Sequence, residues 1–236
     1  MKALILNSGL GHRMGDITKT HPKCMTKIDK NETILSRQLK LLLKFGIKEV
    51  VITTGYFNEV LVSYCRSLNY PIHYNFVNNP LYESTNYIYS IYCARNEIQD
   101  DIILMHGDLV FDESVLREVI NSSKSCMKVS STIALPDKDF KAVVKDGRVL
   151  KVGIEYFDSA MEAQALYKLN KKDWEIWLKE IISFCKNGNT RVYAENAFNQ
   201  VSCKCEIYAL DVKNRLCTEI DTPDDLAKVK EMLKND

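Results

Sequence analysis

The chain has 236 residues, and its 32 basic side chains nearly balance 31 acidic ones, which leaves a formal charge of +1. This balance argues against a protein that binds nucleic acid through bulk positive charge. The length is enough to bury a substantial core. No apolar stretch is long enough to cross a membrane, and the N-terminus lacks the pattern of a signal peptide, so we expect a cytoplasmic protein without a membrane partner.

A glycine-rich loop follows the first predicted strand, Ala3–Leu6. The loop contains Gly9, Gly11 and Arg13, and Lys23 follows directly after a proline. Glycines let backbone N–H groups approach phosphate oxygens closely. An arginine can bind two phosphate oxygens in a fork, and a lysine can place a point charge on the phosphate under attack. The pattern therefore predicts a nucleoside triphosphate site at the end of this strand.

Two familiar glycine motifs do not fit this loop. The chain lacks G-x-x-x-x-G-K-[ST], which argues against a P-loop NTPase. The glycine spacing differs by one residue from the dinucleotide fingerprint, which also expects a helix directly after the loop. Here the helical pattern begins only near Ile34.

Strand and helix patterns alternate through residues 1–125. The predicted strands are Ala3–Leu6, Glu49–Thr53, Ile72–Phe76 and Ile102–Met105, and the predicted helices are Leu35–Phe45, Glu59–Leu68, Tyr87–Arg95 and Ser114–Ile120. Such alternation predicts an α/β fold, a Rossmann-like three-layer sandwich with a mostly parallel central sheet. Ligands of such sheets bind at the carboxyl ends of the strands.

The pattern changes near residue 126, where strands become more frequent. The predicted strands are Lys128–Ala134, Ala142–Lys145, Val149–Val152 and Cys203–Leu210, and the predicted helices are Lys172–Phe184 and Pro223–Leu233. We interpret this part as a β-rich elaboration on the substrate side. The chain is then a single domain, 1–236, with a nucleotide-binding half, 1–125, and an acceptor-binding half, 126–236.

Two aspartates follow predicted strands and are candidates for metal binding. Asp108 comes after an apolar strand, and Asp221 precedes the start of the last helix. If both strands lie in one sheet, both carboxylates face one crevice, and Mg²⁺ prefers such hard oxygen ligands. Asp221 could instead contribute to the N-cap of the last helix, although Thr222 already suits that role. His106 is interpreted as a residue that orients Asp108 or packs.

Five segments, taken in chain order, carry a family resemblance over nearly the whole chain: NSGLGHR…T…PK, EVVITTGY, NNPLYESTNYIYSI, ILMHGDLVF and EIDTPDDL. They resemble the sugar-phosphate nucleotidylyltransferase family. Within that family, the stretch with Asn79, Thr85-Asn86 and Ser90 looks like the phosphocholine cytidylyltransferase branch. The resemblance implies a Mg²⁺-dependent enzyme that transfers a nucleoside monophosphate, here CMP from CTP, and releases pyrophosphate.

The resemblance also implies roles for single residues. Arg13 and Lys23 take the catalytic phosphate roles, and Asp108 and Asp221 take the metal roles. The residues expected to bind the nucleotide are Leu6, Ser8, Gly9, Gly11, Arg13, Lys23, Thr85 and Asn86. The loop departs from the family pattern, because Asn7 and Ser8 stand where two alanines are usual.

The acceptor is expected to be a small phosphorylated molecule. The family includes enzymes for phosphocholine, for phosphonates and for phosphorylated amides such as glutamine phosphate in capsule modification. A choline pocket should surround a quaternary ammonium with aromatic rings. Trp174 and Trp177 are spaced like a core stripe, so the sequence favours a polar acceptor, with Glu162, Gln164 and Glu195 as candidate contacts. Each of these three can equally be a solvated surface residue.

Three alternatives remain open from the sequence. The first is a sugar-1-phosphate nucleotidyltransferase that uses UTP or dTTP. The second is a nucleotide-binding regulatory module without turnover, which the joint presence of both cations and both carboxylates argues against. The third is a glycosyltransferase, although these usually present D-x-D, and this chain has Asp108-Leu109 after Gly107. The chain is expected to be a monomer or a homodimer.

Overall fold

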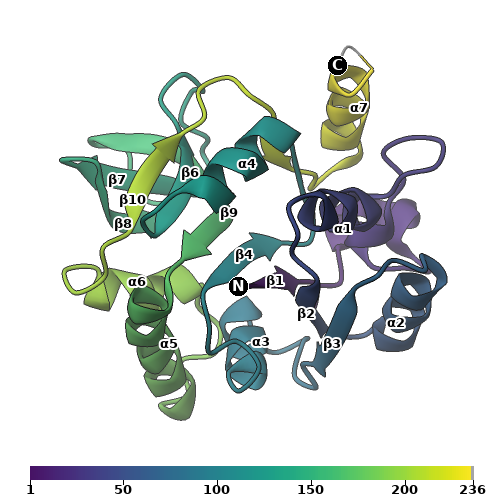
Figure 1. The fold of residues 1–236 in the computed structure, drawn as a ribbon, viewed down its shortest axis with the longest axis horizontal. Coiled ribbons are helices and arrows are strands. Elements are labelled where there is room, and N and C mark those ends of the chain that lie inside the picture. The colour runs from purple at the N-terminus through teal and green to yellow at the C-terminus, as the bar shows by residue number, and fades with distance from the viewer. Residues whose placement is uncertain (235–236) are drawn as a thin grey trace.

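The computed structural model describes residues 1–234. The strands of its main sheet are β1 (Lys2–Leu6), β2 (Glu49–Thr54), β3 (His73–Asn78), β4 (Ile102–His106), β6 (Cys126–Ser130), β7 (Lys141–Lys145), β8 (Arg148–Gly153), β9 (Ala160–Leu169) and β10 (Tyr208–Asp211). They form one nine-stranded sheet in the order β3-β2-β1-β4-β9-β6-β10-β8-β7 (Figure 1). Two further strands, β5 (Leu109–Phe111) and β11 (Cys217–Glu219), pair separately beside it.

The main sheet is mixed. Its first four strands are parallel, as the alternating pattern predicts. Strand β9 then runs antiparallel to both β4 and β6 and joins the two halves of the sheet. The predicted α/β class is confirmed, but the expectation of a mostly parallel sheet holds only for the first half.

Helices cover both faces of the sheet, which gives three layers. The helices are α1 (Ile34–Lys44), α2 (Asn58–Ser67), α3 (Tyr87–Ala94), α4 (Glu113–Asn121), α5 (Lys171–Lys186), α6 (Ala194–Val201) and α7 (Pro223–Met232). The apolar faces of α1, α2 and α4 pack in one core. Those of α3, α5 and α6 pack in a second core on the opposite face. Trp174 and Trp177 are fully buried in this second core, which agrees with their interpretation as a core stripe.

The second half differs from the sequence prediction at four elements. The ten-residue strand β9 and the helix α6 were not predicted. The predicted strand over 203–210 is confined to β10, because the residues before it form the turn after α6. The strand predicted over 128–134 ends at Ser130, where the side chain of Asp211 binds the Ser131 N–H at 3.0 Å. Polar side chains thus end the strand earlier than its apolar pattern suggested.

Candidate active site

A pocket of about 480 Å³ lies at the carboxyl ends of β1 and β4. Its walls come from the glycine loop, the segment between β3 and α3, and the first turn of α3. Every residue that the sequence predicted for the nucleotide or metal site lines this pocket, except Asp221. The lining residues are Leu6, Asn7, Ser8, Gly9, Gly11, His12, Arg13, Pro22, Lys23, Asn79, Tyr82, Thr85, Asn86, Tyr87, Ser90, His106 and Asp108.

The glycine loop wraps closely around the residues that follow it. Gly11 has φ +69°, a left-handed conformation that favours glycine. A Cβ at this position would lie 3.4 Å from the Cβ of Lys23. The hydroxyl of Thr18 donates to the Gly11 carbonyl at 3.0 Å and holds the turn. The glycine therefore lets the loop lie against the lysine that the sequence assigned to phosphate.

Lys23 lies between the two predicted metal carboxylates. Its Nζ is 2.5 Å from Asp108 Oδ2 and 2.6 Å from Asp221 Oδ1. Arg13 reaches Asp221 Oδ1 from the other side, at 2.9 Å. The Lys23 side chain is 14% exposed, whereas that of Arg13 is 66% exposed. The structure thus brings both cations and both carboxylates together at one end of the pocket, with Arg13 the more exposed cation.

The small β5–β11 sheet explains how two distant aspartates meet. Asp108 lies between β4 and β5, and Asp221 follows β11. The pairing of Leu109 with Glu219 brings the two segments together, and the Ile220 N–H donates to the Asp108 carbonyl at 3.0 Å. The two strands that precede the aspartates do not lie in one sheet, because β11 belongs to the two-stranded sheet, and the carboxylates meet through the pairing of β11 with β5 instead.

The charges of this cluster support one another. Burial works against the charge of Lys23, but Asp108 and Asp221 outweigh it and raise the pKa of Lys23. Burial alone would likewise raise the pKa of Asp108, but Lys23 and His106 together lower it. Lysine and aspartate are therefore both ionised at neutral pH, as a site for phosphates and a cation requires.

Sequence reasoning missed Glu219 as part of this cluster. The carboxylate accepts from His106 Nδ1 at 2.7 Å. Burial disfavours the charged form of His106, but Glu219 outweighs this effect and raises the pKa of His106 to about 9. His106 is therefore an imidazolium at neutral pH and is not available as a general base. The available signal was the position of Glu219, two residues before Asp221 in EID.

The donor set fits a hard divalent cation. Asp108 Oδ1 is buried and has no hydrogen-bond partner in the described part of the chain. Asp221 lies across Lys23 from it. Donor atoms of His106, Asp108 and Glu219 also lie within 4.8 Å of one another. Because the oxygens of Asp108 and Asp221 are the ligands that Mg²⁺ prefers, these two residues are the ones that would hold the ion.

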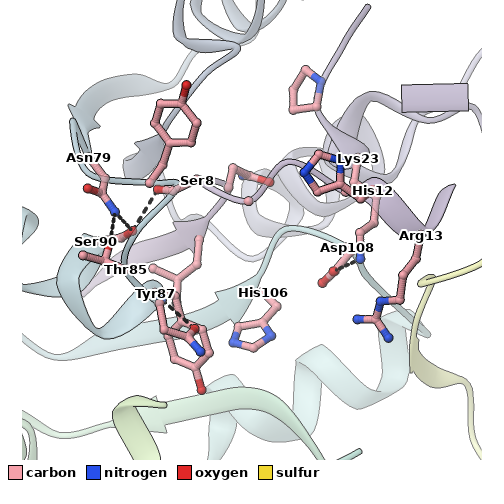
Figure 2. A pocket seen from close by; sticks show the side chains of 17 residues that line it. Ser8, His12, Arg13, Lys23, Asn79, Thr85, Tyr87, Ser90, His106 and Asp108 are labelled. Atoms are coloured by element: carbon pink, nitrogen blue, oxygen red, sulfur yellow. Dashed lines mark hydrogen bonds and ion pairs between the residues drawn. The ribbon is translucent and has the colours of Figure 1, made fainter. Parts of the chain in front are cut away.

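Neutral polar side chains form the opposite end of the pocket. Figure 2 shows Ser8, Asn79, Thr85 and Ser90 together, away from Lys23, Arg13 and Asp108. Asn79 donates to Thr85 Oγ1 at 3.2 Å and to Ser90 Oγ at 3.0 Å. Asn86, the other predicted base-binding residue, caps α3, because its side chain accepts from the Tyr87 N–H at 2.7 Å. Asn79, Tyr82, Tyr87 and Ser90 were not among the predicted site residues.

The candidate acceptor contacts are distributed differently from the expectation. Glu162 is buried and pairs with the equally buried Lys128 at 2.5 Å, and Gln164 donates to Glu162 at 3.0 Å. None of these three side chains lines the pocket. Glu195 is also buried, but it accepts a hydrogen bond from Tyr87, which does line the pocket. Glu195 thus connects to the site through a tyrosine, whereas Glu162 and Gln164 form a separate internal cluster.

Comparison with known families identifies the family of the chain. The model of the MobA-like NTP transferase domain matches residues 3–165. The chain belongs to this family. The predicted resemblance to nucleotidylyltransferases is thereby confirmed, and the matched segment contains all of the pocket lining.

Characterised relatives of this nucleotidyltransferase include cytidylyltransferases. The CTP:phosphoglutamine cytidylyltransferase of Campylobacter jejuni is 31% identical over 160 residues, which cover 64% of this chain and 62% of that protein. The choline-phosphate cytidylyltransferase of Streptococcus pneumoniae is 22% identical over 245 residues, which cover 100% of this chain and 100% of that protein.

Solved structures agree on the fold. The CTP:phosphocholine cytidylyltransferase from Streptococcus pneumoniae matches with a TM-score of 0.78 at 20% identity, over 98% of each chain. The inositol-1-phosphate CTP transferase from T. maritima matches with a TM-score of 0.80 at 23% identity, over 99% of this chain and 94% of that one. Within residues 1–234, no helix has the length and apolar character needed to cross a membrane.

Proposed function

We propose that this protein is a Mg²⁺-dependent cytidylyltransferase that transfers CMP from CTP to a small phosphorylated acceptor and releases pyrophosphate. The observation that carries the proposal is the pair of carboxylates, Asp108 and Asp221, held together around Lys23 at one end of a nucleotide-sized pocket. Such a cluster is suited to stabilising the negative charge that develops on the phosphates during transfer.

The polarity of the pocket orients the nucleotide. The charged end, with Arg13, Lys23 and Asp108, suits the triphosphate. The neutral end, with Asn79 and Thr85, suits a base that is read by hydrogen bonds. Between these ends, Gly9 and Gly11 line the pocket, and glycines let backbone N–H groups approach phosphate oxygens closely.

In the proposed reaction, the acceptor phosphate attacks the α-phosphorus of CTP in line and pyrophosphate leaves. Lys23 turns from the aspartates toward the α-phosphate and stabilises the charge that develops there. Arg13, which is largely exposed and held only by Asp221 among the described residues, swings onto the departing pyrophosphate. Asp108 and Asp221 would hold Mg²⁺, which would supply positive charge to the phosphate oxygens. No general base is needed, because a phosphate monoester is already ionised at neutral pH.

Base choice tests the cytidylyl assignment directly. CTP should be preferred over UTP and dTTP by at least about tenfold in kcat/KM, since a buried hydrogen-bonding site leaves groups unpaired with the wrong base. The measurement is pyrophosphate release over a panel of triphosphates, each with the same mixture of phosphorylated acceptors. Equal turnover with UTP would favour the sugar-1-phosphate alternative. No pyrophosphate with any triphosphate would favour a regulatory module.

The acceptor should carry hydrogen-bonding groups at the end away from its phosphate. The similarity to a CTP:phosphoglutamine cytidylyltransferase supports this. The biological role that we propose for the product is surface polysaccharide modification. Both tryptophans are buried in the core, so neither can stack on a ligand. Among the pocket residues, the buried donors that lack a partner in the described part of the chain are Asn7 Nδ2 and His106 Nε2.

Phosphocholine should therefore be a poorer acceptor than a phosphorylated amide. A trimethylammonium group cannot pair with the free donors, and each buried donor left unpaired costs about 1–3 kcal/mol. The comparison is kcat/KM for phosphocholine against amide-bearing and amine-bearing phosphates, with CTP held saturating. A tenfold advantage for phosphocholine would show that aromatic faces such as that of Tyr87 dominate recognition instead.

A further inference from the structure

Hydrogen bonds link Asn79, Ser90 and Ser8 in series at the neutral end of the pocket, and the donor and acceptor of each bond are fixed. The Leu81 N–H donates to Asn79 Oδ1 at 2.8 Å. Because an N–H can bond only to the oxygen of an amide, this contact determines which side of the Asn79 side chain is the NH₂ group. The Asn79 Nδ2 therefore faces Thr85 and Ser90, as its two hydrogen bonds require.

The same donor-to-acceptor order runs through the hydrogen bonds from Asn79 to Ser8. Both Nδ2 protons of Asn79 are used, one on Thr85 Oγ1 and one on Ser90 Oγ. The Thr85 hydroxyl donates its own proton to the Leu81 carbonyl at 2.7 Å. Ser90 accepts from Asn79 and donates to Ser8 Oγ at 2.9 Å (Figure 2). Thr85 and Ser90 thus each accept one hydrogen bond and donate one, and the Ser8 hydroxyl is the acceptor at the end of this series.

One donor proton remains, and it belongs to Ser8. No hydrogen bond found in residues 1–234 uses the proton of its hydroxyl. Ser8 is only 9% exposed, and the surface that it exposes forms part of the pocket wall. Its backbone is also tightly confined, because a Cβ at Gly55 would lie 2.5 Å from the Ser8 carbonyl oxygen. The pocket is the direction left for this proton.

We propose that Ser8 selects the base by donating its hydroxyl proton to ring N3 of cytosine, and that Asn79 fixes this direction through Ser90. The inference rests on the proposed use of CTP. Cytosine N3 carries a lone pair, whereas N3 of uracil and thymine carries a proton. Cytosine N3 can accept this proton, whereas the N3–H of uracil can only bond to the remaining lone pair of Ser8 Oγ, which leaves the Ser8 proton without a partner. Ser8 is then a specificity-determining residue of the nucleotide site.

The test uses 3-deaza-CTP, in which N3 is replaced by C–H. With the wild-type protein, this change should lower kcat/KM by about tenfold, the effect of one lost hydrogen bond that leaves a buried donor unpaired. In Ser8→Ala, CTP and 3-deaza-CTP should be used almost equally. Calorimetric Kd values for the two nucleotides should follow the same pattern, and thermal melting checks that the variant folds. A penalty of the same size in Ser8→Ala would overturn the assignment of Ser8 to N3.

A second variant tests the direction of the chain. In Asn79→Asp the side chain can only accept, so Ser90 donates its proton to the new carboxylate and Ser8 donates to Ser90. A lone pair of Ser8 Oγ, and no longer its proton, then faces the pocket. The ratio of kcat/KM for CTP over UTP should fall by about tenfold or more. An unchanged ratio would overturn the role of Asn79.

Ser84→Ala is the matched control, because Ser84 lies on the same loop and its exposed hydroxyl bonds, within residues 1–234, only to the Leu81 carbonyl, at 3.4 Å. The ratio should stay at the wild-type value in this variant. The outcomes also separate the inference from the proposed function. A wild-type protein that does not use CTP contradicts the function, whereas CTP use with no effect of Ser8 or Asn79 contradicts this inference alone.

Discussion

Asp108→Asn should lower kcat/KM on the order of 10³-fold, the largest effect expected for a single substitution in this chain. Asparagine keeps the shape of the side chain but removes its negative charge. The proposed ion then loses one of its two carboxylates, and Lys23 loses the partner at 2.5 Å. The measurement is pyrophosphate release with CTP at several Mg²⁺ concentrations, since a weakened metal site should require more Mg²⁺.

The control is Asp16→Asn, which makes the same chemical change on the neighbouring loop. The Asp16 side chain is 89% exposed and pairs with Lys19. Exposed pairs of this kind contribute little, so activity should stay near the wild-type value. Activity of Asp108→Asn within about threefold of wild type would remove Asp108 from the site.

Lys23→Ala should lower kcat by about 10²-fold or more while the Kd for CTP changes much less. The reason is that the charge that Lys23 meets grows as the α-phosphorus is attacked, so its contribution is larger in the transition state than in the bound substrate. Steady-state kinetics give kcat and KM, and calorimetry gives the affinity for CTP. A rise in KM with an unchanged kcat would make Lys23 a binding residue only.

Lys19→Ala is the matched control for this substitution. Lys19 lies four residues before Lys23, its side chain is 70% exposed, and its ion-pair partner in the described chain is Asp16. Removing it changes the net charge of the protein by the same amount. A comparable loss in both variants would mean that the overall charge near the loop matters, and not the position of Lys23.

Local signals explain why much of the first half could be predicted. Short segments encode the glycine loop, the cations and the alternation of strands and helices. One example is the start of α1, where Thr33 and Ser36 form a capping box. Strand β9 carries no such signal. Its sequence, AMEAQALYKL, is rich in helix-forming residues and becomes a strand because β4 and β6 pair with it on both sides.

The part of the site that sequence reasoning missed depends on long-range pairing. Glu219 contacts His106 only because β11 pairs with β5, more than a hundred positions earlier in the chain. Glu162 and Glu195 look alike in the sequence, yet one pairs with Lys128 inside the sheet and the other binds Tyr87 beside the pocket. Which carboxylate faces a ligand is decided by tertiary packing and not by residue type.

The position of Lys23 has a consequence for the order in which ligands arrive. Its ammonium group fills the space between Asp108 and Asp221, so this protein carries a built-in substitute for the ion that the two carboxylates would bind. The long lysine side chain must move away before both oxygens become free. A triphosphate offers it a new anionic partner, whereas a metal ion alone offers none. Nucleotide and metal should therefore enter as one complex, and Lys23 neutralises the two carboxylates until they do.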